Sequence, residues 1–141
     1  MIKSTRNQIG NAKNYYQGST KKVLAVCSAG ILRSATLQNL LIRKYGYNVR
    51  NCGTASDFAL IPLSEALVAW ADVIVFVHQD NYIESGLSQK EQQWLDKDVV
   101  VFKIEDDYEF NNPELVELLQ KQWDLYEELK KDTPEEHFFR L

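Results

Sequence analysis

The 141-residue chain contains few of the residues on which several common site types depend. Its two cysteines are too few for a disulfide framework, and its two histidines, His78 and His137, are too few to suggest a metal centre. No apolar run approaches the roughly eighteen residues of a membrane span, and the first eight residues lack the apolar centre of a signal peptide. We therefore expect a cytoplasmic protein without a metal, a cofactor or a membrane association.

Acidic residues are missing from the first fifty positions, which hold nine lysines and arginines. The remaining positions carry seven basic and twenty acidic residues, so the net charge of −4 is unevenly distributed along the chain. A positive field in the first part would attract a dianionic substrate. Alternatively, these are ordinary solvated surface charges. Nucleic acid is not an expected partner, because the acidic remainder would be repelled by its phosphates.

Length and residue pattern together predict one small α/β domain. We expect a polar N-terminal extension over residues 1–21, a domain over 22–131 and a C-terminal tail over 132–141. Apolar runs predict strands over 22–27, 47–52, 72–78 and 99–104, and helical spacing predicts helices over 33–45, 63–71, 88–95 and from 113 onward. Strands that alternate with helices predict a three-layer fold, in which helices flank a four-stranded parallel sheet. Ligands bind such sheets beyond the carboxyl ends of the strands.

The most informative segment places a cysteine and an arginine six positions apart, between the first predicted strand and the first predicted helix. Cys27 would lie at the bottom of a phosphate-binding loop and Arg33 at its rim, with the backbone amides of the loop directed at an anion. The phosphate-binding residues would be Ser28, Ala29, Gly30, Ile31, Leu32 and Arg33. Such a site favours the nucleophilic thiolate of Cys27, and a guanidinium can bind two phosphoryl oxygens at once. The alternative is an inert buried cysteine followed by a solvated arginine.

An acidic segment follows the last predicted strand and should therefore emerge at the same edge of the sheet. It reads Glu105-Asp106-Asp107-Tyr108. A carboxylic acid held over the loop could protonate the leaving oxygen of a phosphate ester and later activate water. Tyr108 could form one wall of an aryl-phosphate pocket, or it could serve in packing alone.

These residues resemble the low-molecular-weight protein tyrosine phosphatases. Cys27, Arg33 and Ser34 match the Cys-x5-Arg-Ser loop of that family, and 104–108 matches its acid segment, with Asp107 where proline is usual. Gly53-Thr54 resembles the Gly-Thr after the second strand of the family. The chain is most similar to a subgroup of predicted tyrosine phosphatases with an Asp-Asp-Tyr acid loop, followed by a segment like 113–119.

The resemblance implies a two-step mechanism through phosphocysteine, without a metal or a cofactor. Cys27 would be the nucleophile and Arg33 the phosphoryl-binding residue, and the hydroxyl of Ser34 would support the thiolate. Aligned with the family, Asp106 becomes the general acid, and Asp107 is the alternative if the loop is shifted by one residue.

Two departures from the family concern the loop itself. Gly30 stands where many relatives have asparagine, and Leu32 stands where some have a second cysteine, so a disulfide within the loop cannot form. Cys52 could substitute as a redox partner, although a buried strand cysteine is the simpler interpretation.

The sequence thus predicts a cysteine-dependent phosphomonoester hydrolase, most simply a protein tyrosine phosphatase. Its partner would be a phosphorylated protein or another phosphate monoester. Two alternatives remain open: an arsenate reductase on the same scaffold, and a noncatalytic phosphate- or phosphoprotein-binding module.

Overall fold

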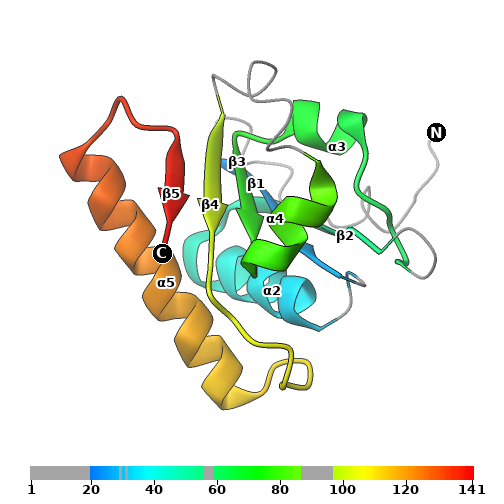
Figure 1. Cartoon of the computed structure of the whole chain (residues 1–141). Coiled ribbons are helices and arrows are strands. Elements are labelled where there is room, and N and C mark those ends of the chain that lie inside the picture. Colours follow the sequence, from blue (N-terminus) through cyan, green and yellow to red (C-terminus); the bar gives the residue numbers. More distant parts are fainter. Residues whose placement is uncertain (1–19, 29, 31, 56–58, 87–96) are drawn as a thin grey trace.

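The computed structural model describes residues 20–28, 30, 32–55, 59–86 and 97–141. Its elements alternate along most of the chain, as Figure 1 shows. In chain order they are β1 (Lys22–Cys27), α2 (Arg33–Tyr45), β2 (Asn48–Gly53), α3 (Glu65–Trp70), β3 (Val73–Phe76), α4 (Gln79–Ser85), β4 (Asp98–Val101), α5 (Pro113–Asp132) and β5 (Phe138–Arg140). The strands form one parallel sheet in the order β2-β1-β3-β4-β5.

The predicted parallel α/β fold is confirmed, but the sheet has five strands where the sequence predicted four. The additional strand β5 lies within the segment 132–141, which we expected to be a tail, and it pairs with β4 from Val99 opposite Phe138 to Val101 opposite Arg140. Only three residues long, β5 gives too short an apolar run to stand out in the sequence. The short helix α4 was not predicted either, and the helix predicted over 88–95 lies outside the described residues.

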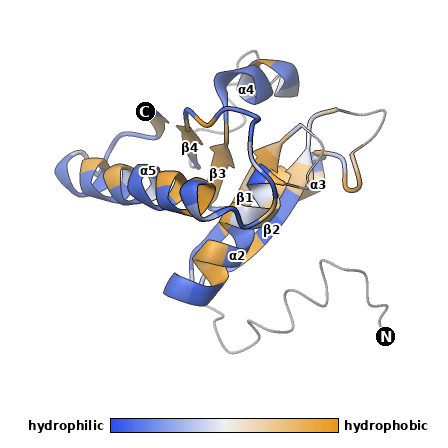
Figure 2. Cartoon of the chain, turned by 90° about the horizontal axis from the view of Figure 1, so that it is seen from below, coloured by the Kyte–Doolittle hydropathy of each residue, from blue (hydrophilic) through white to orange (hydrophobic). Residues whose placement is uncertain are grey.

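Helices cover both faces of the sheet, and each face has its own apolar core. Helices α2 and α5 contribute Leu37, Leu41, Leu115, Leu119 and Trp123 to one core, and helices α3 and α4 contribute Leu67, Val68 and Tyr82 to the other. Figure 2 shows the two pairs of helices on opposite sides of the strands. None of the described helices is both long and apolar enough to cross a membrane.

Local sequence signals set the ends of the two long helices. Helix α2 ends at Gly46, whose backbone N–H bonds to the carbonyl oxygens of Ile42 and Leu41. Helix α5 begins after Asn112, whose side chain accepts the backbone N–H of Glu114, and Pro113 occupies its first position. The start of α2 is the end that matters for the site, because it follows directly on the loop after β1.

The strand β5 should owe its attachment mainly to one of two adjacent phenylalanines. Phe139 is 6% exposed and packs edge-on against Tyr126, whereas Phe138 is 42% exposed. We expect Phe139→Ala to lower the free energy of unfolding by about 3 kcal/mol and Phe138→Ala by less than about 1 kcal/mol. Urea denaturation of both variants measures the difference, and equal losses would show that β5 is not held by its buried side chain.

Candidate active site

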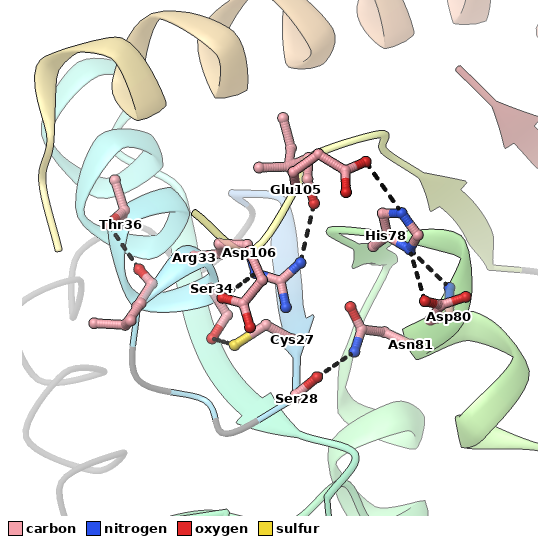
Figure 3. Close-up of polar contacts among 12 residues, drawn as sticks. Cys27, Ser28, Arg33, Ser34, Thr36, His78, Asp80, Asn81, Glu105 and Asp106 are labelled. Atoms are coloured by element: carbon pink, nitrogen blue, oxygen red, sulfur yellow. Dashed lines mark hydrogen bonds and ion pairs between the residues drawn. The ribbon is translucent and has the colours of Figure 1, made fainter. Parts of the chain in front are cut away.

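The candidate site lies at the carboxyl edge of the sheet, where segments after β1, β2, β3 and β4 meet. Cys27 is the last residue of β1, and Arg33 is the first residue of α2. The acidic segment comes down from β4 to the same place, and Figure 3 shows Asp106 beside Arg33 and Cys27. Parallel strands place these loops together because their carboxyl ends share one edge.

The thiol of Cys27 is buried and receives two polar contacts. Its Sγ lies 3.1 Å from the Oγ of Ser34 and accepts the backbone N–H of Gly30 at 3.1 Å. When the sulfur is ionised it has no proton to give, so both partners must donate to it. Hydrogen bonds to the charged form favour that form. The arrangement is therefore suited to a thiolate nucleophile.

Arg33 is 5% exposed, which excludes the alternative of a solvated arginine at the helix start. Its Nη1 donates to the carbonyl oxygen of Ile104 at 3.0 Å, and its Nε lies 3.5 Å from Oδ1 of Asp106. Both contacts are with the segment that follows β4. The guanidinium thus connects the start of α2 to the acidic segment.

The loop is pressed against the end of β2 at Gly30. This residue has a φ of +74°, and a Cβ built on it would lie 3.0 Å from the carbonyl carbon of Cys52 and 3.2 Å from the nitrogen of Gly53. Backbone N–H groups of Thr54 and Ala55 also bond to the carbonyl oxygens of Cys27 and Ser28, each at 2.9 Å. Glycine is required here for its left-handed φ and for the close approach of two backbones.

The helix α2 begins without a side-chain cap. Leu32 precedes it and is 37% exposed, and within the described part of the chain no side chain bonds to the first amides of the helix. Uncapped amides and the positive end of the helix dipole favour an anion at this position. The predicted loop residues Ala29 and Ile31 lie outside the described residues.

The side chains of the acidic segment differ from one another in exposure and in their contacts. Asp106 makes the ion pair with Arg33, although its side chain is 67% exposed. Asp107 is exposed, and no ion pair with Arg33 is found for it among the described residues. Tyr108 is half-buried against the core and donates its hydroxyl to Glu114 at 3.2 Å. The structure therefore brings Asp106, rather than Asp107, to the arginine.

Cys52 is completely buried in β2, on the other face of the sheet from Cys27. In the strand register it lies opposite Val26, and its side chain joins the core beneath α3 and α4. Cys27 belongs to the core on the α2 side. Burial, and then the nearby charge of Cys27, raise the pKa of Cys52 to about 12. Cys52 thus remains a neutral thiol at physiological pH.

Sequence reasoning missed two polar residues near the loop. His78 accepts the backbone N–H of Asp80 with its Nδ1 at the start of α4, and its Nε2 lies 3.5 Å from Glu105. Asn81, one turn further, donates to the Oγ of Ser28 at 3.0 Å. Neither residue belongs to a recognisable motif, and helix α4, which His78 caps and which carries Asn81, was itself not predicted.

The other described basic residues of the first fifty do not gather at the site. Lys21 pairs with Glu127, and Arg50 stacks on Trp70. Arg43 and Lys44 lie in the last turn of α2, roughly 15 Å along the helix from Arg33. In the described part of the first fifty positions, positive charge at the loop thus comes from Arg33 and from the start of α2. The described residues as a whole hold no group of three His, Cys, Asp or Glu side chains able to bind a metal ion.

Comparisons with known proteins identify the fold. No family model and no curated protein matches the sequence. The tyrosine phosphatase Wzb from Escherichia coli K30, solved with phosphate, is similar in structure with a TM-score of 0.58 at 15% identity, over 78% of this chain and 98% of that chain. The YwlE arginine phosphatase from Geobacillus stearothermophilus gives 0.56 at 14% identity, over 80% and 97% of the two chains.

A third structure, the low molecular weight protein tyrosine phosphatase from T. tengcongensis, gives a TM-score of 0.53 at 15% identity, over 80% of this chain and 99% of that chain. At these identities the likeness concerns the fold. The chain therefore has the fold of low-molecular-weight phosphatases.

Gly30 and Gly86 have nearly the same φ, so replacing each by alanine distinguishes the cost of the backbone conformation from the cost of close packing. Gly86 has a φ of +75° and nothing within 4 Å of a built Cβ, whereas Gly30 meets backbone atoms. We expect Gly86→Ala to cost about 1 kcal/mol of stability through its φ alone. Gly30→Ala should cost more and should also slow alkylation of Cys27 by iodoacetamide, because the loop must move away from β2. Equal losses in denaturation, with unchanged alkylation, would refute the packing argument.

Proposed function

We propose that the protein is a cysteine-dependent phosphomonoester hydrolase that acts on phosphotyrosine in proteins. One observation carries the proposal. The sulfur of Cys27 lies 3.1 Å from two hydrogen-bonding groups, next to a buried Arg33 whose guanidinium contacts Asp106. Nucleophile, phosphoryl-binding cation and carboxyl group therefore occupy one small region.

A phosphoryl group would bind in the loop with its oxygens directed at backbone amides and at Arg33. The guanidinium can donate two parallel hydrogen bonds to a phosphoryl group, which a point charge cannot do. Because Arg33 is buried, its attraction for a dianion is weakly screened by solvent. Preorganised donors of this kind stabilise the charge that spreads over the equatorial oxygens in the transition state.

In the first step the thiolate of Cys27 attacks phosphorus, and the bond from phosphorus to the leaving oxygen breaks. The leaving oxygen takes the electron pair, and Asp106 supplies a proton to it. The exposed position of Asp106 at the mouth of the site suits contact with a leaving group that extends into solvent.

In the second step water attacks the phosphocysteine. Asp106, now ionised, takes a proton from the water as the new P–O bond forms. The P–S bond breaks and restores the thiolate, which the Gly30 amide and the Ser34 hydroxyl stabilise as it leaves. Inorganic phosphate is released.

An aryl ester is the substrate class that the surroundings favour. Tyr108 follows the acid segment and is half-buried, so its ring can line one side of the opening. Leu32 and Phe110 are exposed apolar residues on the segments that flank it. Proteins of similar fold include a tyrosine phosphatase and an arginine phosphatase, so the leaving group is the part of the substrate that requires a test.

An arsenate reductase would need a second thiol to form a disulfide with Cys27. Successive side chains of a strand point to opposite faces of the sheet, and Cys52 is paired with Val26 rather than with Cys27. Its buried, protonated thiol is also a poor attacking group. Both observations disfavour this alternative.

A noncatalytic phosphate-binding module would need the same amides and the same arginine. It would not need a cysteine held by two hydrogen-bonding partners, nor a carboxyl group beside the arginine. The hydrolase makes use of all of these groups.

The proposal is tested by turnover of p-nitrophenyl phosphate and of phosphopeptides. We expect the wild-type protein to hydrolyse a phosphotyrosine peptide faster than phosphoserine or phosphoarginine peptides, and Cys27→Ser to abolish turnover while phosphate still binds. A serine hydroxyl is far less ionised than a thiol, but the amides and Arg33 remain. Substantial residual hydrolysis in the variant would refute the assignment of the nucleophile.

Removal of Asp106 and removal of Asp107 should have different effects on how the rate of cleavage depends on the leaving group. We expect Asp106→Ala to slow phenyl phosphate cleavage by about 100-fold, but to slow an activated nitrophenyl ester less, because a basic leaving oxygen depends most on a proton donor. Asp107→Ala is the matched control and should leave the rates of cleavage of both esters unchanged. Rates over a series of aryl phosphates decide between them, and a steep dependence in the Asp107 variant would reverse the assignment.

A further inference from the structure

Helix α4 is not part of the predicted site, yet one of its side chains contacts the phosphate-binding loop. Asn81 is 1% exposed, and its Nδ2 lies 3.0 Å from Oγ of Ser28 and 3.4 Å from Oγ1 of Thr54. Thr54 in turn lies 2.6 Å from a carboxylate oxygen of Glu84, which also belongs to α4. In Figure 3, Asn81 and Ser28 lie to the right of Cys27, and the guanidinium of Arg33 lies above it.

The donor and the acceptor of each of these contacts can be assigned, starting from Glu84. The carboxylate of Glu84 can only accept, so Thr54 donates its hydroxyl proton to it. The Oγ1 of Thr54 then needs a donor, which Nδ2 of Asn81 supplies. The second proton of Nδ2 goes to Oγ of Ser28. Ser28 therefore accepts, and in the described part of the chain no acceptor is found for its own hydroxyl proton.

The other end of the Asn81 amide supports this assignment. Its Oδ1 is buried, and no hydrogen-bond partner for it is found within the described residues. Turning the amide over would place Oδ1 against Thr54, whose single proton already goes to Glu84. A buried acceptor without a partner destabilises a fold, and such groups often mark functional sites.

Ser28 is the first residue after the nucleophile, and its backbone is already fixed. Its carbonyl oxygen accepts the N–H of Ala55 at 2.9 Å, which holds the loop against the segment after β2. Its hydroxyl group can still rotate, and the bond from Asn81 occupies one of the acceptor positions of Oγ. Because Ser28 directly follows Cys27, a phosphoryl group attacked by Cys27 would be an acceptor for the hydroxyl proton.

We infer that Asn81 is a positioning residue that orients the hydroxyl of Ser28 as a further donor to the bound phosphoryl group. The inference rests on the proposed function, since it assigns Ser28 to the phosphoryl group that Cys27 attacks. Phosphoryl oxygens are acceptors, so an oriented hydroxyl proton matches them. Ser28 would be the substrate-binding residue, and Asn81 would act through it.

The test measures the affinity for inorganic phosphate from the protection of Cys27 against iodoacetamide, so it does not depend on turnover. We expect Asn81→Ala and Ser28→Ala each to raise the Kd for phosphate about tenfold, as expected for one lost hydrogen bond to a charged ligand. The double variant should also be about tenfold weaker, because both changes remove the same contact. A double variant about 100-fold weaker would show independent effects and overturn the inference.

Two further measurements separate positioning from a general loosening of the loop. The pH profile of Cys27 alkylation without phosphate should be unchanged in Asn81→Ala, because the contacts of Sγ with Gly30 and Ser34 remain. A shifted profile would indicate a disturbed loop instead. Gln79→Ala, at an exposed position of the same helix, is the matched control and should leave the Kd unchanged.

If Asn81→Ala does not fold, variants of Thr54 test the same inference. Thr54→Ser keeps the hydroxyl and should retain wild-type affinity for phosphate, whereas the isosteric Thr54→Val should lose affinity severalfold. Equal affinities in these two variants would overturn the inference. A wild-type protein that is protected by phosphate but hydrolyses no aryl phosphate would refute the proposed function, while the phosphate affinities would still decide the role of Asn81.

Discussion

The buried guanidinium of Arg33 is the charge around which the candidate site is organised. A cation that is 5% exposed is costly unless it is paired, and its described ionic partner, Asp106, is itself two-thirds exposed at a distance of 3.5 Å. The bond from Nη1 to the carbonyl oxygen of Ile104 holds the side chain in place without neutralising it. The guanidinium therefore remains able to attract a bound anion. The same side chain joins the start of α2 to the segment after β4.

The sheet separates the two thiols of the chain and so gives them different chemistry. Cys27 ends β1 among donors at the carboxyl edge, and Cys52 points into the opposite core from the neighbouring strand. Alternation along a strand is enough to keep neighbouring cysteines apart even though their strands are paired. Burial then holds the thiol of Cys52 in its neutral form, with a pKa of about 12. The proposed hydrolysis through a covalent intermediate needs only one reactive thiol, whereas disulfide chemistry needs two.

The loop is supported from two sides by segments that contribute no catalytic group. Gly30 packs against the backbone of Cys52 and Gly53, and on the other side Asn81 contacts Ser28. His78, the N-cap of the helix that carries Asn81, lies near Glu105 in the acidic segment. Helix α4 and its N-cap residue therefore contact both the loop after β1 and the acidic segment after β4. A precise site needs such support, because small displacements cost much of the rate.

The sequence by itself determined the features that depend on neighbouring residues. The spacing from Cys27 to Arg33, the stop of α2 at Gly46 and the start of α5 after Asn112 are local signals, and the structure confirms both helix ends. The alternation of elements likewise predicted a parallel sheet, because short links leave few topologies open.

Only the tertiary structure decided the features that depend on contacts between distant segments. These are the fifth strand, the burial of Arg33, the proximity of Asp106 rather than Asp107, and the contact of Asn81 with Ser28. The basic residues that are close in sequence are dispersed by the fold, since α2 carries Arg43 and Lys44 away from Arg33. The physical reason is common to all of these cases: a one-residue change of register or a quarter turn of helix redirects a side chain, and packing between elements, rather than local pattern, sets that orientation.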